Sequence, residues 1–341
     1  MGGSQRMTIT IANMLKKTFD VSFVVFSGIQ EPIILQAIST DIPVTIIDLD
    51  YSRKSKLLWN AFFVRKHIHN EKPDYVFASL CSLNLILIVA TFFSKVRCVI
   101  RLDNYYTIES KIAQFLIKLL YPFSYKIISQ QEDMTKIFEN SSSRYRGKIH
   151  TIHNPIDREL ISKLLKVADN PYQNKNNINY VWVANVTWNK GNDIAIKAMN
   201  EVIKYNKSAC LYFVGSINNK AYYEDCMRLI SDLDLKEYVI FVGFDANPYR
   251  WIKYCDCFVL PSRIEGLPNV LVDAMYLGKP VVAANCIAFM NYLVDNGRNG
   301  YIVPVEDYLA LADAMKKAIF LKDLKMSYIP SECQDFINVF D

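Results

Sequence analysis

The chain has 341 residues, and at roughly 150 residues per domain this length predicts two domains. Hydrophobic residues make up 51% of the chain, which is enough to fill two cores. No apolar run reaches the roughly 18 residues that a membrane-spanning helix requires, and LNLILIVATFF (83–93) reads as a buried helix. The start, MGGSQRM, lacks the apolar segment of a secretory signal peptide, so we expect a cytoplasmic protein.

The net charge of +5 is unevenly distributed. Residues 1–165 contain 21 Lys and Arg against 14 Asp and Glu, an excess of seven positive charges. Such an excess favours anionic lipid or phosphate ligands, although ordinary surface charge explains it equally well. The eight cysteines are scattered and form no CxxC pair, so we expect reduced, packed thiols rather than a zinc site. We expect solvated or structural roles for the four histidines, which are His67, His69, His150 and His153.

Strands and helices alternate through the first half of the chain. The stretch 4–17 places Met7, Ile11 and Met14 on one face at helical spacing. Further helices are predicted at 54–70 and 110–123. Apolar runs predict strands at 21–26, 43–48, 75–79, 97–102 and 125–129.

The polar segment DNPYQNKNN (169–177) reads as a linker, and the alternation restarts after it. The second half predicts strands near 180–184, 210–214, 238–242, 256–260, 280–284 and 300–303. Apolar strands separated by helices indicate parallel sheets covered on both faces. We therefore expect an α/β protein with two doubly wound, Rossmann-like domains facing a cleft, in which ligands lie beyond the carboxyl ends of the strands.

The stretch PSRIEGLPNVLVDAM (261–275) follows the strand at 256–260 and opens a helix near Pro268. The free N–H groups of a helix N-terminus attract phosphate. Glu265 precedes that helix and Asp273 lies about one turn inside it, so two acids flank the expected phosphate. This arrangement suits a nucleotide sugar, with one acid for sugar hydroxyls and one for ribose. Two acids that merely charge or cap a helix start remain the simpler alternative.

Six pieces of the sequence, in order, resemble the GT4-type family of retaining glycosyltransferases with the GT-B fold. They are GGSQR (2–6), HNPID (153–157), WNKG (188–191), the strand ends YFVG and FVGF, the acid-x7-acid stretch above, and GKPVVA (278–283). The resemblance implies an acceptor-side domain over 1–165 and a donor-binding domain over 166–324. It also implies a tail over 325–341 that returns toward the first domain.

The resemblance also implies roles for individual residues. Lys190 would contact the donor diphosphate, Glu265 would bind donor-sugar hydroxyls, and Asp273 would bind the ribose diol. The backbone N–H groups of Gly266, Leu267 and Asn269 would lie near the sugar and phosphates. Gly2 and Gly3 would let the backbone of the first domain approach the donor phosphate, because a side chain there would clash. No catalytic metal or other cofactor is expected, so we interpret the DLD triplets at 48–50 and 232–234 as coincidental.

Several positions depart from the family pattern. Asn185 replaces an Arg, which removes a bidentate phosphate ligand, and we expect Arg263 to supply the lost charge. Asp273 is one methylene shorter than the usual Glu, and Tyr292 stands where a Glu is common. Asp103 takes the place of a His and is either a catalytic group near the acceptor hydroxyl or a turn residue. The family's first strand normally precedes the Gly-Gly loop, so we expect a first-domain sheet without that strand.

The sequence thus predicts a retaining transferase that moves a hexose or N-acetylhexosamine from a nucleotide sugar, with UDP as the expected nucleotide. The expected acceptor is a growing surface glycan linked to lipid, as in bacterial O-antigen or capsule synthesis. The segment 111–126 would touch the inner membrane surface or form a core-facing helix. The alternative is a catalytically decayed relative that serves as a binding partner. A nicotinamide-dependent enzyme would need GxGxxG after a strand, which is absent, and no nucleic acid partner is expected.

Overall fold

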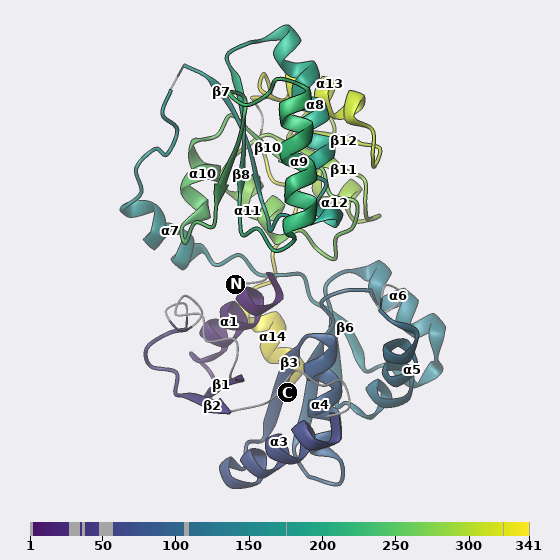
Figure 1. Cartoon of the computed structure of the whole chain (residues 1–341). Helices are drawn as coiled ribbons and strands as arrows, with labels where there is room; N and C mark the ends of the chain where they lie inside the picture. Colours follow the sequence, from purple (N-terminus) through teal and green to yellow (C-terminus); the bar gives the residue numbers. More distant parts are fainter. Residues whose placement is uncertain are drawn as a thin grey trace. The chain divides into compact units, whose positions relative to one another are not determined.

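The computed structural model describes residues 3–26, 35, 38–47, 57–105, 109–174, 176–322 and 324–340. The chain divides into two compact units. Unit 1 comprises Met1–Ile156 and Pro330–Asp341, and unit 2 comprises Asp157–Ile329 (Figure 1). The division falls before helix α7 (Arg158–Lys166), whereas the sequence suggested a boundary after residue 165.

Unit 2 contains one parallel sheet of six strands in the order β12-β11-β10-β7-β8-β9. The strands are apolar and mostly buried, as expected for a parallel sheet with helices on both faces. Their bounds are β7 Ile178–Val183, β8 Ala209–Val214, β9 Val239–Gly243, β10 Cys257–Leu260, β11 Val281–Ala284 and β12 Gly300–Val303. The helices between them are α8 Asn192–Tyr205, α9 Lys220–Asp232, α10 Pro248–Tyr254, α11 Asn269–Tyr276, α12 Met290–Leu293 and α13 Tyr308–Ala318.

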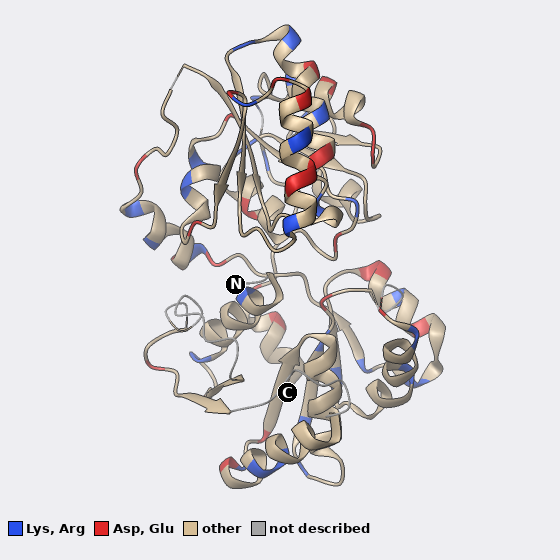
Figure 2. Ribbon diagram, viewed as in Figure 1, with Lys and Arg blue, Asp and Glu red and all other residues tan. Residues whose placement is uncertain are grey.

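The helix α9 illustrates how the sheet is covered. It buries Tyr222, Cys226 and Ile230, which recur at helical spacing. Figure 2 shows Lys and Arg interspersed with Asp and Glu along the rest of this helix. One face of α9 therefore packs on the protein and the opposite face is solvated.

The strand order identifies where a ligand should lie in unit 2. The strand β7 pairs with β8 on one side and with β10 on the other, and both pairings are parallel. The chain therefore leaves β7 and β10 toward opposite edges of the sheet. Such a reversal opens a crevice at the carboxyl ends of the two central strands, where α/β sheets bind ligands.

The described residues of unit 1 form two separate parallel sheets, β1-β2 and β3-β4-β5-β6. The strands are β1 Phe23–Phe26, β2 Val44–Ile47, β3 Tyr75–Ser79, β4 Arg97–Arg101, β5 Lys126–Ser129 and β6 Ile149–Thr151. The helices are α1 Gly3–Leu15, α3 Leu57–Glu71, α4 Cys81–Thr91, α5 Lys111–Leu120, α6 Glu132–Ser141 and α14 Cys333–Phe340. The expectation of a missing strand ahead of Gly2 stays a prediction.

The C-terminal helix α14 completes the core of unit 1. Phe336, Val339 and Phe340 are buried in one cluster with residues of α1, β4 and β5. The Phe340 ring lies 5.3 Å from the ring of Tyr75 on β3. Unit 1 therefore depends on apolar contacts between segments from opposite ends of the chain.

The predicted α/β fold with parallel sheets is confirmed, and every predicted strand has a counterpart. The helix ends differ from the predicted ends by a few residues: α1 ends at Leu15 rather than at residue 17, and α5 passes into the short 3-10 turn η3 (Tyr121–Phe123). The eight cysteines are all free thiols. Within the described ranges, no helix is long and apolar enough to cross a membrane, and no group of three or more potential ligands is placed to hold a metal. The triplet at 48–50 lies outside these ranges.

The contact between α14 and α1 generates a stability prediction. We expect Phe336→Ala to lower the free energy of unfolding by about 3–5 kcal/mol, because it removes a large side chain that is 1% exposed. Denaturant-induced unfolding followed by circular dichroism measures the change. Phe115→Ala on α5 is the matched control, and its exposed ring predicts a loss within about 0.5 kcal/mol. Equal losses in the two variants would contradict the role of α14.

Candidate functional site

The turn after β7 brings the predicted lysine to the carboxyl end of the central strands. It contains the short 3-10 helix η5 (Trp188–Lys190), followed by Gly191 in the left-handed conformation at the start of α8. A Cβ atom on Gly191 would lie 2.1 Å from the carbonyl oxygen of Pro261. Because no side chain fits there, glycine is required both by the backbone angle and by the approach of the second loop.

The loop after β10 is held against this turn by backbone hydrogen bonds. The N–H of Arg263 donates to the carbonyl of Asn189 at 2.9 Å, and the N–H of Ile264 reaches the same oxygen at 3.4 Å. Asn189, just before Lys190, is hydrogen-bonded to the loop 261–268, and Gly191, just after it, lies against Pro261 of the same loop. The two loops form one surface at the point where the strand order reverses.

Lys190 and Glu265 form an ion pair on this surface. The Lys190 Nζ lies 2.7 Å from Oε1 and 2.8 Å from Oε2 of Glu265. The Ser262 hydroxyl also donates to Glu265 Oε1 at 2.7 Å. The Glu265 side chain is 8% exposed and that of Lys190 is 24% exposed, so the carboxylate is largely desolvated while the ammonium still reaches solvent. The site therefore offers a cation for phosphate beside an acceptor for hydroxyl groups.

Cys286, after β11, lies within the electrostatic reach of this pair. Burial, reinforced by the negative charge of Glu265, raises the pKa of the Cys286 thiol to about 12. The thiol is therefore neutral at physiological pH and does not act as a nucleophile there. The sequence did not single out Cys286, because a cysteine among apolar residues has no distinctive signal.

The remaining predicted donor residues lie on the same loop and helix. Leu267 is buried, and α11 begins at Asn269 directly after Pro268. Asp273 lies within α11 and is only 2% exposed, so its carboxylate is enclosed by protein. Gly266 lies between Glu265 and Leu267 in the loop. The structure thus places these residues on the loop 261–268 and in helix α11, whose positive dipole end faces this loop.

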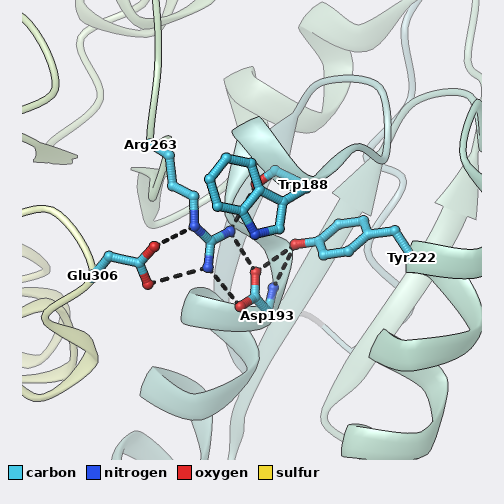
Figure 3. A network of polar contacts seen from close by, with 5 residues as sticks. All are labelled: Trp188, Asp193, Tyr222, Arg263 and Glu306. Atoms are coloured by element: carbon cyan, nitrogen blue, oxygen red, sulfur yellow. Dashed lines mark hydrogen bonds and ion pairs between the residues drawn. The ribbon is translucent and has the colours of Figure 1, made fainter.

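Arg263, which we expected to contact a donor phosphate, is instead held by protein groups (Figure 3). Its guanidinium forms paired contacts with Asp193 at 2.8 and 2.7 Å, and it contacts both carboxylate oxygens of Glu306. A fifth bond reaches the carbonyl of Trp188 at 2.7 Å. Because a guanidinium has five N–H donors, all of them are used in this arrangement and none is left for phosphate.

Asp193 and Arg263 shift each other's pKa toward the charged form. Burial alone would raise the pKa of Asp193, but hydrogen bonds from Arg263 and Tyr222 lower it below its usual value. The hydrogen bond to Asp193 is the main cause of a raised pKa for the Arg263 guanidinium. Both groups therefore remain charged near neutral pH. Asp193 and Glu306 lie 70 and 43 residues from Arg263 in the sequence, so no local pattern indicates that they are its partners.

The structure also places Asn185 and Tyr292, two of the positions that depart from the family pattern. Asn185 is exposed in the turn between β7 and η5. Tyr292 is on α12, where its ring lies 4.9 Å from that of Phe289. Neither position therefore supplies a charge to the site.

Unit 1 holds Asp103 and the start of α1. The Ser4 hydroxyl donates to Asp103 Oδ2 at 3.3 Å, and burial raises the pKa of Asp103. Gly3 is the first residue of α1, whereas Gly2 lies outside the described residues. Asp103 therefore makes a polar contact with the first turn of α1.

A buried polar cluster surrounds the carboxyl ends of the unit 1 strands. The side chain of Arg101, which is 1% exposed, hydrogen-bonds to Ser79 at 2.9 Å and to Asn154. Asn154 donates to Gln130 at 2.9 Å. These residues end or follow apolar strands, which is the sequence signal that would have found them. Asn154 belongs to the HNPID stretch, and the cluster shows what that amide does: it links the ends of β4, β5 and β6.

Comparisons with known proteins follow the same division of the chain. The profile described as Glycosyltransferase Family 4 matches residues 1–160, and the profile described as Glycosyl transferases group 1 matches residues 177–319. Together they cover almost the whole chain. Both profiles name glycosyltransferases.

Individual relatives support this assignment. An uncharacterized glycosyltransferase of Methanocaldococcus jannaschii is 26% identical over 71% of this chain, which spans 64% of that protein. A Campylobacter jejuni N-acetylgalactosaminyltransferase, named for an acceptor on diphospho-undecaprenol, is 25% identical over 96% of this chain and 89% of its own length.

A solved structure shows the fold. The structure of HepE from Anabaena, in complex with UDP and glucose, covers 99% of this chain and 94% of that chain with a TM-score of 0.77 and 22% identity. At this identity the likeness establishes the arrangement of the chain, which is GT-B. The two profile matches show that the chain belongs to the family 4 and group 1 glycosyltransferases, and the solved structure shows its GT-B fold.

Proposed function

We propose that this enzyme transfers a hexose or N-acetylhexosamine from a UDP-sugar to a growing, lipid-linked surface glycan, with retention at the anomeric carbon. The single observation that carries the proposal is the Lys190–Glu265 pair at the point where the strand order reverses. A cation, a desolvated carboxylate and a helix N-terminus together fit the phosphate and hydroxyl groups of a nucleotide sugar. The UDP and glucose named for HepE, and the lipid-linked acceptor named for the C. jejuni relative, agree with this choice of substrates.

The ion pair suggests how the donor is received. Each Glu265 oxygen accepts from Lys190, so a bound diphosphate would draw the ammonium toward itself and leave Glu265 free to accept from sugar hydroxyls. Asp273, on helix α11 after this loop, would bind the ribose diol. The loop 261–268 would then hold the sugar between Glu265 and the N–H groups at the start of α11.

The chemistry follows from these positions. The diphosphate would leave on the same face that the acceptor hydroxyl attacks, which requires no protein nucleophile. Lys190 and the start of α11 would stabilise the negative charge that develops on the leaving phosphate. Asp103 would lie on the acceptor side, in unit 1. No metal is required, because the cationic charge comes from protein groups.

A catalytically decayed relative is the second reading that the sequence allowed. The departures at Asn185, Tyr292 and Asp103 and the expected missing first strand favoured it. The intact Lys190–Glu265 pair and the preserved loop 261–268 oppose it, because drift would not spare these ligand-facing groups selectively. We therefore keep the transferase as the proposed function.

The acceptor suggests that unit 1 lies at the cytoplasmic face of a membrane. The side chains of Ile112, Phe115 and Leu119 on α5 are exposed, although apolar groups usually face a core. Phe123 and Phe93 are also exposed, and the ring of Phe92 lies 5.2 Å from that of Phe123, which joins this surface to the turn after α4. An exposed apolar face flanked by lysines suits a peripheral contact with anionic lipid.

Nucleotide binding is the first test of the donor site. We expect UDP to bind the purified protein in calorimetry, and Lys190→Ala to weaken binding about 10- to 100-fold by removing a charge-assisted hydrogen bond. Asp273→Asn should weaken it too, whereas the exposed Lys204→Ala on α8 should not. Binding should survive EDTA. Binding of GDP alone would change the donor class, and a folded chain that binds neither nucleotide would support the decayed relative.

The stereochemical outcome is a separate prediction. With a UDP-α-sugar and a lipid-linked acceptor, we expect the new glycosidic bond to be α, since the leaving group departs on the face of attack. The one-bond coupling constant between the anomeric carbon and its proton, measured by NMR on the product, distinguishes the two anomers. A β-linked product would contradict the retaining mechanism while leaving the donor site intact.

The membrane contact is tested with vesicles. Wild-type protein should co-sediment with vesicles that contain anionic phospholipid, and less with neutral vesicles, because charge assists the apolar insertion. Replacing Phe93 and Phe123 by Ser should reduce binding about tenfold, given the apolar area lost. The exposed Phe320→Ser in unit 2 is the control and should bind as wild type. Equal binding by all three proteins would remove Phe93, Phe123 and the turns that carry them from the proposed membrane surface.

A further inference from the structure

We propose that Arg263 is a positioning residue: its clamp with Asp193 and Glu306 fixes Lys190 and Glu265 for the donor diphosphate without touching the ligand. This inference rests on the proposed function and extends it to residues that the family pattern does not assign. Figure 3 shows the five side chains that form the network.

The clamp joins segments that are distant in sequence. Arg263 lies on the loop after β10, Asp193 in the first turn of α8, and Glu306 in the turn between β12 and α13. Tyr222 of α9 adds a fourth segment, because its hydroxyl donates to Asp193 at 2.5 Å. One guanidinium therefore links the turn after β7 to the turn after β12, with a second layer of support from α9.

The clamp is also sheltered. The indole of Trp188 lies over the Arg263 guanidinium, with 4.5 Å between the guanidinium carbon and the ring centroid. The side chain of Arg263 is only 7% exposed, although Trp188 itself is exposed. Partial exclusion of water strengthens charge-assisted hydrogen bonds, so this network holds its geometry better than a surface ion pair would.

The clamp lies close in sequence to both members of the Lys190–Glu265 ion pair, because Arg263 is two residues before Glu265 and contacts the turn just before Lys190. The Arg263 backbone N–H donates to Asn189, the neighbour of Lys190, and its side chain holds the carbonyl of Trp188 in the same turn. Ser262, the neighbour of Arg263, donates to Glu265. Loss of the guanidinium would remove the bond to Trp188 and the links to Asp193 and Glu306, so the two loops that carry the ion pair would be left with the remaining backbone and Ser262 contacts.

The charge balance separates this role from direct phosphate binding. Two carboxylates surround Arg263, so its charge is already neutralised, and its five donors are in use. A phosphate would have to displace a carboxylate to reach it. Within the part of the chain that the structure describes, Lys190 pairs with one carboxylate, that of Glu265, and it keeps access to solvent, which makes it the better phosphate ligand.

A double-mutant cycle tests the inference. We expect Arg263→Ala to weaken UDP binding about tenfold in the wild-type background, and less than about twofold in a Lys190→Ala background, because Arg263 acts through Lys190. An equal loss in both backgrounds, or none in the first, would overturn the proposal. Arg263→Lys should resemble Arg263→Ala, since an ammonium cannot form the five-bond fork. Restoration by lysine would instead indicate a direct charge on the ligand.

Arg250 offers a matched control. It contacts Asp245 through two nitrogens at 2.9 and 2.7 Å and stacks against Trp251, but it lies on α10. Arg250→Ala should leave UDP affinity within twofold of wild type. A loss of affinity comparable to that of Arg263→Ala would show that any arginine–carboxylate contact in unit 2 has the same effect, and would overturn the specific role of Arg263.

A measurement without ligand keeps the inference independent of the proposed donor. The rate at which acetic anhydride modifies Lys190, followed by mass spectrometry, reports how firmly Glu265 holds its ammonium. We expect Arg263→Ala to raise this rate severalfold relative to Lys204 in the same sample, and Arg250→Ala to leave it unchanged. If wild type binds no nucleotide but the rate rises, the donor proposal fails and the clamp stands. An unchanged rate overturns the clamp.

Discussion

The close approach of two loops is the constraint on which the site depends. The carbonyl of Pro261 occupies the space where a side chain of residue 191 would lie, so the chain must have glycine there. The sheet makes this approach possible, because β7 and β10 are neighbours and both end at the same edge. Everything that we assign to the donor is carried by the few residues on either side of this contact.

Lys190 and Glu265 show how this constraint becomes a chemical property. They are 75 residues apart in sequence, yet their charged groups meet because one loop follows β7 and the other follows β10. Burial of Glu265 would be unfavourable without Lys190 and Ser262 to satisfy its oxygens. The pair thus holds one positive and one negative group side by side at the donor site. Arg263 and its carboxylates add a rigid frame outside it, so that the ligand-facing groups and the supporting groups are different residues.

Much of this arrangement was visible in the sequence. Apolar runs located the strands, and the order of the motifs around Lys190 and Glu265 indicated the family and the donor loop. The partners of Arg263 were not predictable, because a local pattern does not show that residue 306 folds back onto residue 263. The packing of Phe336 against α1 was also not predictable, since an amphipathic segment does not indicate which surface it packs against. Pairings between distant segments depend on the tertiary fold, and the sequence shows them only where a family motif already exists.

The position of α14 in unit 1 has a consequence for synthesis. Translation proceeds at about 5–20 residues per second, so roughly 9–35 s separate the completion of residue 156 from the appearance of residue 333. During that interval unit 2 can fold as a continuous segment, while the surface of α1 that receives Phe336 and Val339 stays uncovered. Unit 1, whose first segments are made before unit 2, is therefore the last of the two to close, and its nascent form presents an apolar surface to chaperones until α14 emerges.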